Sequence, residues 1–173
     1  MDLTILFTPL DESIYTKEYA PNSFFRSIKA YGDKMPDYRE MQIAIFGVKE
    51  ERGTSTNIGC AKGADEIRKK LYNLKKGNGS YRIVDLGNLN PGLDLDETYV
   101  RISEVCRILL ENNVMPLILG GTHDLDYGQY RGYEDMEKLI SLLNIDAFLD
   151  LEDGKESDLS RQHIHKILLH EPN

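Results

Sequence analysis

Short apolar runs alternate with longer amphipathic stretches along the chain. Four runs have the length and the β-branched or leucine-rich composition of buried strands, at residues 42–48, 81–87, 114–119 and 142–145. The third run is followed directly by glycines and the fourth by an acidic residue, a pattern typical of the strands of a parallel sheet. Helical periodicity follows each run and predicts helices over residues 60–76, 96–112, 134–141 and 159–169. This alternation indicates an α/β fold with right-handed crossovers.

Each predicted helix presents one apolar face to the core. In the first helix this face is formed by Ile67, Leu71 and Leu74, and in the third by Met136, Leu139 and Ile140. Asp96 or a neighbouring residue is expected to cap the second helix, and Pro172 to end the last one. The apolar face of the second helix comprises Tyr99, Ile102, Val105, Cys106, Leu109 and Leu110.

Residues 1–40 are predicted to form an N-terminal arm on a core that spans residues 41–173, within a single domain. Residues 3–7 have the pattern of a short strand or an extended segment, and residues 23–28 that of one or two helical turns. The aromatic residues of the arm could contact a partner. We expect them instead to anchor the arm to the core, because most aromatic surface area in folded proteins is buried.

Polar clusters follow two of the predicted strands. Residues 120–124 follow the third apolar run, and residues 146–150 follow the fourth. In open α/β sheets the ligand site lies at the carboxyl ends of the strands, so both clusters should share one edge of the sheet. His123, Asp146 and Asp150 are the residue types that bind divalent transition metals. The alternative is structural: His123 would bond a backbone carbonyl, and the two aspartates would cap the following turn.

Other polar segments favour structural roles. The glycine-rich loop 49–59 precedes a helix but matches neither the Walker nor the dinucleotide pattern, so a plain connection is expected. Asp124 and Asp126 are expected to open a helix, where acidic side chains favour the N-terminus. His163 and His165 lie two positions apart near a lysine-bearing helix face and should not chelate together.

Composition limits the classes of partner. The chain has 173 residues, a formal net charge of −8 and a pI near 5.0, which argues against nucleic acid and anionic membranes as partners. No apolar run approaches the length of a membrane span, and the first residues lack the basic start of a signal peptide. The two cysteines, Cys60 and Cys106, lie far apart in sequence and are expected to be buried thiols. A cytoplasmic location is expected.

Three motifs together resemble the ureohydrolases, the family of arginase, agmatinase and formimidoylglutamase. Residues 120–124 resemble the family's Gly-Gly-Asp-His-Ser motif, and residues 146–150 its Asp-Ala-His-x-Asp motif. Residues 59–68 are similar to a glycine-rich loop leading into Gly-Pro-x-x-Ile-Arg, with Ala64 in place of proline. Residues 9–13 and 47–50 most resemble a bacterial formimidoylglutamase-like branch. The resemblance implies an arginase-like three-layer α/β/α fold with a mainly parallel sheet.

The same resemblance implies a manganese site with an incomplete set of ligands. Family members use two manganese ions, and His123, Asp146 and Asp150 match the ligands of the first. Phe148 stands where a histidine would bind the second ion, and Thr122 replaces an acidic residue beside the first ligand. The family's later Ser-x-Asp-x-Asp motif does not occur in the sequence. One ion or none is therefore expected, and the chain is expected to be a truncated half of the fold with an uncovered sheet edge.

Three functional hypotheses follow. The first is a family member with a degenerate binuclear manganese site that is not catalytic as this chain. The second is the N-terminal part of an active metal-dependent hydrolase of linear amidines such as formimidoylglutamate, agmatine or arginine. The third is a metal-free module that binds a small amidine or amino-acid-like ligand. The resemblance and the exposed edge also imply a homo-oligomer.

Overall fold

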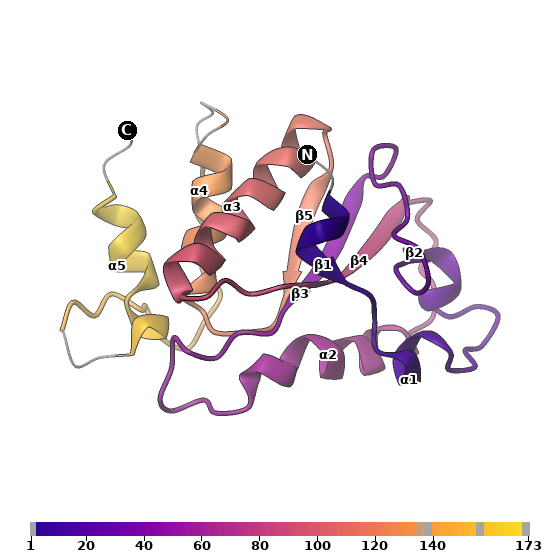
Figure 1. The fold of residues 1–173 in the computed structure, drawn as a ribbon, viewed down its shortest axis with the longest axis horizontal. Helices are drawn as coiled ribbons and strands as arrows, with labels where there is room; N and C mark the ends of the chain where they lie inside the picture. The colour runs from indigo at the N-terminus through magenta and orange to yellow at the C-terminus, as the bar shows by residue number, and fades with distance from the viewer. Residues whose placement is uncertain (1–2, 135, 137–139, 155–157, 171–173) are drawn as a thin grey trace.

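The computed structural model describes residues 3–134, 136, 140–154 and 158–170. It has three layers (Figure 1). One face of the sheet is covered by α2 (Gly63–Leu71), with α1 (Glu12–Tyr15) beside it, and the other face by α3 (Leu95–Glu111) and α4 (Leu125–Glu134). The predicted α/β/α class is confirmed.

The sheet is mainly parallel, with β3 (Ile43–Val48) at its centre. β3 pairs in parallel with β4 (Ile83–Leu89) on one side and with β5 (Met115–Leu119) on the other. Two short strands, β1 (Phe7–Thr8) and β2 (Lys29–Ala30), add to β4, antiparallel and parallel respectively. The first three predicted strands are thus confirmed, although the second begins and ends two residues later than expected.

Alternate residues of β3 fill the two layers of the core. Ala44, Phe46 and Val48 are fully buried in the larger cluster, on the side of α3. Ile45 points to the other face and packs against Ala64 of α2. A strand buried on both faces is apolar at nearly every position, which explains the continuous apolar run in the sequence.

The first helix is shorter than predicted and presents a different face. A 3-10 turn at Cys60–Lys62 leads into α2, which ends at Leu71. The prediction that Ile67 and Leu74 face the core is wrong, because they are 43% and 59% exposed. Arg68 faces the sheet instead and is fully buried. Its partner is the buried carboxylate of Asp85 on β4. Helical periodicity cannot reveal a contact with a residue so far along the chain.

The second helix agrees with the prediction. Five of the six predicted apolar positions of α3 are buried, and Leu110 is half-buried. The cap is Asp94, whose side chain accepts a hydrogen bond of 2.7 Å from the backbone N–H of Glu97. The thiol of Cys106 is buried as expected, whereas Cys60 is only partly buried.

The region after β5 differs most from the prediction. α4 begins directly after Asp124, in agreement with the acidic start predicted there, and packs along α3. The predicted helix over residues 134–141 lies largely outside the described residues, as does Leu139. Met136 lies in a turn, and Ile140 is 41% exposed, contrary to the inward position predicted for it.

The fourth predicted strand does not form. Residues 142–145 have no regular secondary structure, and Leu143 and Ile145 are 82% and 89% exposed. β5 is consequently the last strand on its side of the described sheet. Among the described residues, nothing covers this apolar run, so its hydrophobic pattern is not converted into burial.

The two ends of the described chain pack as short elements. Residues 3–7, predicted as extended, form a 3-10 turn at Leu3–Leu6 before β1, and the predicted turn in residues 23–28 is a 3-10 turn at Phe25–Ser27. A 3-10 turn at Leu159–Arg161 and α5 (His163–Leu168) replace the predicted last helix, and α5 packs on α4. Pro172 lies outside the described residues. None of the described helices is long and apolar enough to span a membrane.

The aromatic residues of the N-terminal segment contact the core. The ring of Phe25 lies 4.4 Å from that of Tyr19 and 5.0 Å from that of Tyr72, measured between centroids. Tyr72 follows α2, so this cluster attaches the N-terminal segment to the helix layer. The anchoring interpretation agrees with these contacts. The division into an arm and a core within a single domain stays a prediction.

Candidate metal centre

Two glycines after β5 determine where His123 lies. Gly120 and Gly121 have φ angles of +69° and +87°, a region that L side chains rarely adopt. A Cβ atom at Gly120 would lie 2.5 Å from the backbone nitrogen of Ala64 in α2. The turn therefore needs glycine for conformation and for space, and it places His123 at the carboxyl end of β5.

Three side chains converge at this end of the sheet. Nδ1 of His123 lies 3.2 Å from Oδ2 of Asp146 and 3.3 Å from Oδ2 of Asp150. One ligand atom from each residue lies within 4.8 Å of the others. The structure thus brings together the three residues predicted from the sequence, with the aspartates 23 and 27 positions after His123, although residues 142–145 do not form the strand that was expected to position both aspartates. An imidazole and two carboxylates suit a divalent ion such as manganese.

The two aspartates have different surroundings. Asp150 is 6% exposed, and its φ of +50° is uncommon for a residue with a side chain. Asp146 is more exposed and accepts a 3.1 Å hydrogen bond from the backbone N–H of Phe148. That hydrogen bond and the nearby His123 hold the pKa of Asp146 below its usual value. Asp146 is therefore ionised at neutral pH and available to a cation.

Phe148 lines the same small cavity as His123 and Asp150. This cavity has a volume of about 130 Å³. The ring is 57% exposed, and the guanidinium carbon of Arg161 lies 4.6 Å from its centroid, a cation–π distance. A phenyl ring has no lone pair for a metal. Phe148 therefore gives this side of the cavity an apolar surface.

His163 is a neighbour that sequence reasoning placed on a lysine-bearing helix face. It is 2% exposed, and its Nδ1 lies 3.0 Å from the carbonyl oxygen of Ser160 and 3.8 Å from Oδ2 of Asp150. Its ring meets that of His123 edge to face, with centroids 5.8 Å apart. No sequence signal distinguished it, because its burial depends on the docking of α5.

Behind His123, buried polar groups support the turn. The hydroxyl of Tyr99 donates a 2.6 Å hydrogen bond to Oδ2 of Asp124, and burial together with this carboxylate raises the pKa of Tyr99. Oδ1 of Asp124 and the hydroxyl oxygen of Thr122 are buried without a hydrogen-bond partner in the described structure. Thr122 is also one of the residues that line the small cavity.

The loop after β3 closes the other side of the cavity. The carboxylate of Asp158 accepts hydrogen bonds from the hydroxyls of Thr54 (2.9 Å), Ser55 (2.7 Å) and Thr56 (2.9 Å). It also accepts one of 3.0 Å from the backbone N–H of Ser55. These bonds attach the loop to the segment before α5. The loop 49–59 therefore connects β3 to the 3-10 turn before α2 and also lines the candidate site through Thr54, Thr56 and Asn57.

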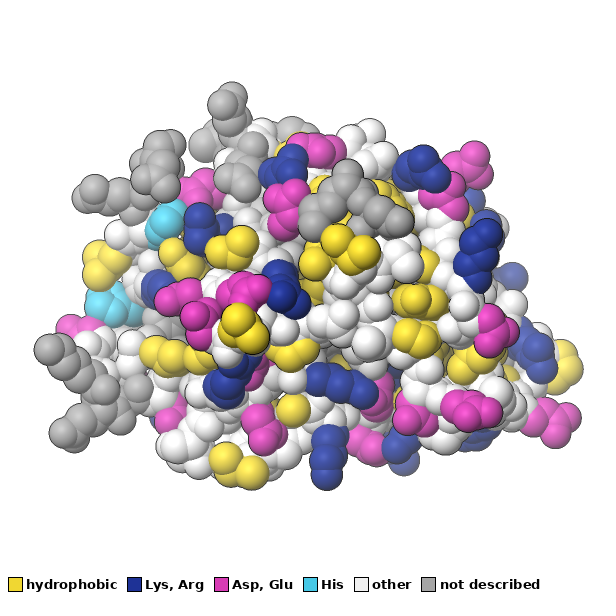
Figure 2. Space-filling model, in the orientation of Figure 1, with side chains coloured by type: hydrophobic (Ala, Val, Ile, Leu, Met, Phe, Trp, Pro, Cys, Tyr) yellow, Lys and Arg dark blue, Asp and Glu magenta, His cyan; other side chains and the backbone are white. Residues whose placement is uncertain are grey.

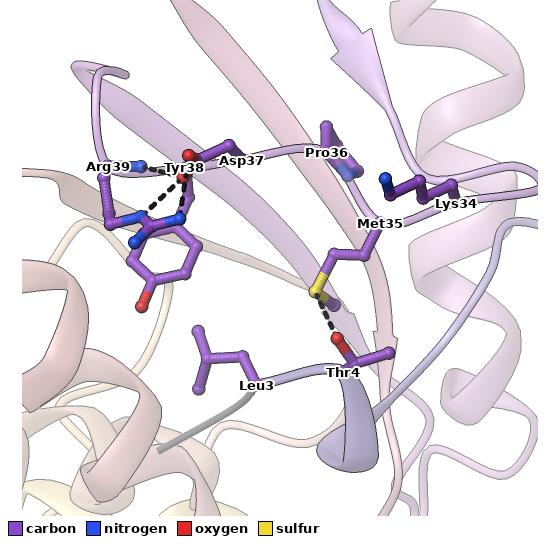
Figure 3. A pocket seen from close by; sticks show the side chains of 8 residues that line it. All are labelled: Leu3, Thr4, Lys34, Met35, Pro36, Asp37, Tyr38 and Arg39. Atoms are coloured by element: carbon purple, nitrogen blue, oxygen red, sulfur yellow. Dashed lines mark hydrogen bonds and ion pairs between the residues drawn. The ribbon is translucent and has the colours of Figure 1, made fainter.

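A larger cavity, of about 600 Å³, lies elsewhere (Figure 3). It is an open groove between the N-terminal 3-10 turn and residues 34–39. Figure 3 shows the guanidinium of Arg39 paired with the carboxylate of Asp37, at 2.9 Å between Nε and Oδ1. None of the three candidate metal ligands lines this groove.

Comparisons of the sequence and of the fold with known proteins lead to the same family. The family model for the arginase family matches residues 41–167. Formimidoylglutamases from Salmonella paratyphi A and Salmonella arizonae are each 32% identical to the chain, over 67% and 73% of its length. The chain covers only 39% and 42% of those two relatives, so it spans less than half of their length.

Solved structures show the same fold. The formimidoylglutamase of Bacillus subtilis superposes with a TM-score of 0.73 at 17% identity, covering 92% of this chain and 52% of that one. A formiminoglutamase of Trypanosoma cruzi, solved with Mn²⁺, gives a TM-score of 0.71 at 19% identity, covering 78% and 50%. At these identities the likeness establishes the fold. The family model matches well over half of the residues, and the chain therefore belongs to the arginase family.

Proposed function

We propose that this chain binds a single Mn²⁺ ion through His123, Asp146 and Asp150, and that by itself it does not hydrolyse amidines. The observation that supports the proposal is the convergence of these three side chains, with ligand atoms within 4.8 Å, at the carboxyl end of β5. Three protein donors, with water completing the coordination, suffice for one ion of modest affinity. The curated relatives are formimidoylglutamases, and a related Trypanosoma cruzi structure was solved with Mn²⁺.

Phe148 supports the limit of one ion. It lines the cavity beside His123 and Asp150 but offers no donor atom. A paired site needs about six protein ligands shared between two ions, and the part of the chain that the structure describes brings three together here. In a metal-dependent hydrolase the bound ion lowers the pKa of water and orients it. We propose that one ion held by three ligands does not provide all the groups that amidine hydrolysis requires.

The experiment is a Mn²⁺ titration of the purified chain by calorimetry, with electron paramagnetic resonance to count the bound ions. The wild type should bind one ion, and His123→Ala should lower the affinity at least tenfold. His165→Ala is the matched control, because His165 lies on α5 outside the cluster and its loss should change nothing. Phe148→His should raise either the affinity or the number of ions bound. Unchanged binding in His123→Ala would refute the site.

A second candidate function is that of the N-terminal part of an active hydrolase of linear amidines. The names of the relatives favour it, because a formimidoylglutamase acts on formimidoylglutamate. Incubation of the Mn²⁺-loaded chain, and of any longer protein of which it is the N-terminal part, with formimidoylglutamate, agmatine and arginine, followed by assays for formamide, urea and ammonia, decides between the two. Product above the metal-free control would favour the hydrolase.

The third hypothesis, a metal-free binding module, rests on the small cavity and the buried, unpartnered hydroxyl of Thr122. It predicts that an amidine or amino-acid-like ligand raises the melting temperature of the chain in the presence of a metal chelator. The proposed single-ion site predicts no such rise without Mn²⁺. The location in the cytoplasm and the homo-oligomer also stay predictions.

A further inference from the structure

The short helix α5 is attached to the helix layer on one side of the sheet. It lies beside α4 (Figure 1), and Ile167, which is 6% exposed, belongs to the same core cluster as residues of α3 and α4. The ammonium of Lys166 lies 4.1 Å from the ring centroid of Tyr127 on α4 and 4.8 Å from that of Tyr99 on α3, both cation–π distances. One buried apolar side chain and one cation therefore hold α5 in place.

The first residue of α5 meets the candidate metal ligands. The imidazole of His163 is buried, its ring packs edge to face on that of His123, and its Nδ1 lies 3.8 Å from Oδ2 of Asp150. Nδ1 donates a 3.0 Å hydrogen bond to the carbonyl of Ser160, because a carbonyl oxygen can only accept. His163 is thus held by its own turn, and its ring limits where the two ligands beside it can move.

A backbone hydrogen bond joins the segment of Asp150 to the turn before α5. The N–H of Glu152 donates to the carbonyl of Arg161 at 3.1 Å, two residues after Asp150 and two before His163. Asp150 itself has a φ of +50°, a conformation that costs energy for a residue with a side chain and persists where the surroundings hold it. The turn that begins α5 provides such surroundings, so the position of Asp150 depends on where α5 lies.

We propose that α5 acts as a strap: its docking on α3 and α4 fixes His123 and Asp150 in the arrangement that binds the ion, and His163 is the positioning residue that transmits this docking. The proposal rests on the single-ion site proposed above. Because the ion binds the docked form, any change that undocks α5 lowers the apparent affinity in proportion to the docked fraction. By linkage, bound Mn²⁺ favours the docked helix by the same factor.

The side chains that hold α5 differ from those that would bind the ion. Substitution of Ile167 or Lys166 leaves all three candidate ligands in place. His163 is also not counted as a ligand, because its Nδ1 is used by the carbonyl of Ser160 and its Nε2 faces Oδ2 of Asp126 on α4, at 3.6 Å. A change in Mn²⁺ affinity after substitution of Ile167 or Lys166 therefore reports the position of the ligands and not their number.

The main test is Ile167→Ala in the full chain, because it removes buried packing under α5 and leaves the ligands unchanged. Calorimetry should show an affinity for Mn²⁺ that is lower by about tenfold, still with one ion per chain. Leu168→Ala is the matched control, because Leu168 is 67% exposed on the same helix and its loss should not change the affinity. Lys166→Ala should give a smaller decrease, and Lys166→Arg should restore the wild-type value, since arginine keeps a cation over the rings.

Amide hydrogen exchange of the metal-free chain gives a second readout, at the amide of Glu152. Ile167→Ala should speed exchange at Glu152 and in residues 163–168, while the amides of β3 keep their wild-type rates and show that the fold is intact. If β3 also exchanged faster, Lys166→Ala would take the place of Ile167→Ala, because Lys166 is an exposed residue. In the wild type, added Mn²⁺ should slow exchange in residues 163–168.

Two results would overturn the strap. The first is wild-type Mn²⁺ affinity in a variant whose residues 163–168 exchange faster. The second is wild-type exchange at Glu152 in that variant, because the segment of Asp150 would then be held without α5. A wild-type chain that binds no Mn²⁺ would refute the single-ion site instead, and the exchange at Glu152 would alone decide whether α5 positions Asp150.

Discussion

At the scale of single residues, an internal ion pair controls how α2 packs on the sheet. Arg68 and Asp85 are both fully buried, and the guanidinium binds the carboxylate through two contacts of 2.9 Å. Arg68 also donates to the carbonyl of Gly87 (2.8 Å) and to the side-chain oxygen of Asn88 (2.6 Å). Tyr72 donates a further 2.7 Å hydrogen bond to Asp85. Burying these charges is tolerated because every partner is present.

Removing the arginine should therefore be costly. Arg68→Leu leaves the Asp85 carboxylate buried without its counter-charge, and we expect a loss of about 3–5 kcal/mol in the free energy of unfolding. The matched control is Arg39→Ala, which breaks an exposed pair with Asp37 and should leave the free energy of unfolding almost unchanged. Urea denaturation measures both. Equal costs would show that the buried pair contributes no more than a surface pair.

Asp158 gives a prediction for pH. Hydrogen bonds from Ser55, Thr56 and Thr54 hold the pKa of Asp158 well below its usual value. A carboxylate with a lowered folded-state pKa stabilises the fold above its unfolded pKa of about 4, and the stabilisation disappears as pH falls toward the folded-state pKa. Asp158→Asn should lower the melting temperature at pH 6–7. Its difference from wild type should shrink as the pH is lowered below about 4. A difference independent of pH would contradict this assignment.

At the scale of elements, caps and turns determine where the helices and the candidate ligands begin. Asp94 caps α3 through the N–H of Glu97, and the Glu97 carboxylate accepts a 2.6 Å hydrogen bond from the backbone N–H of Leu93. The sequence predicted an acidic cap within two residues of the right position. It predicted α2 less well, because periodicity counts Arg68 as a surface residue, whereas a partner on β4 allows its burial.

The α3 cap predicts a modest, local effect. Asp94→Ala should cost about 1 kcal/mol in the free energy of unfolding, because the N–H of Glu97 loses its acceptor at the start of the helix. Asp94→Asn keeps an acceptor and should retain most of the stability. Thermal unfolding of the two variants beside wild type checks this. If Asn were as harmful as Ala, charge at the helix end would outweigh the hydrogen bond.

The glycine turn after β5 links fold and site. Gly120→Ala would place a Cβ atom 2.5 Å from the backbone of Ala64, at a φ angle of +69°. We expect a loss of more than about 1 kcal/mol in stability and weaker Mn²⁺ binding, since the turn that positions His123 must shift. Gly77→Ala, where a Cβ meets open space, is the control and should be neutral. Wild-type Mn²⁺ affinity in Gly120→Ala would show that the turn does not position His123.

At the scale of the whole molecule, the sequence predicted the parallel sheet and the grouping of the three candidate ligands. The sequence-based prediction failed where the burial of a segment depends on other residues that pack over it. Residues 142–145 have the pattern of a buried strand, but burial depends on what packs against them, and no described residue covers Leu143 or Ile145. The burial of His163 likewise depends on the docking of α5. On the face in Figure 2, acidic and basic side chains are interspersed, and the absence of a nucleic-acid partner stays a prediction.

The most direct test of the account is anomalous diffraction at the manganese edge from crystals of the chain grown with Mn²⁺. The account predicts one peak, within bonding distance of His123, Asp146 and Asp150, and none beside the ring of Phe148. Two peaks a few ångströms apart at this site would contradict the single-ion proposal. A map without any peak at the three side chains would contradict metal binding itself.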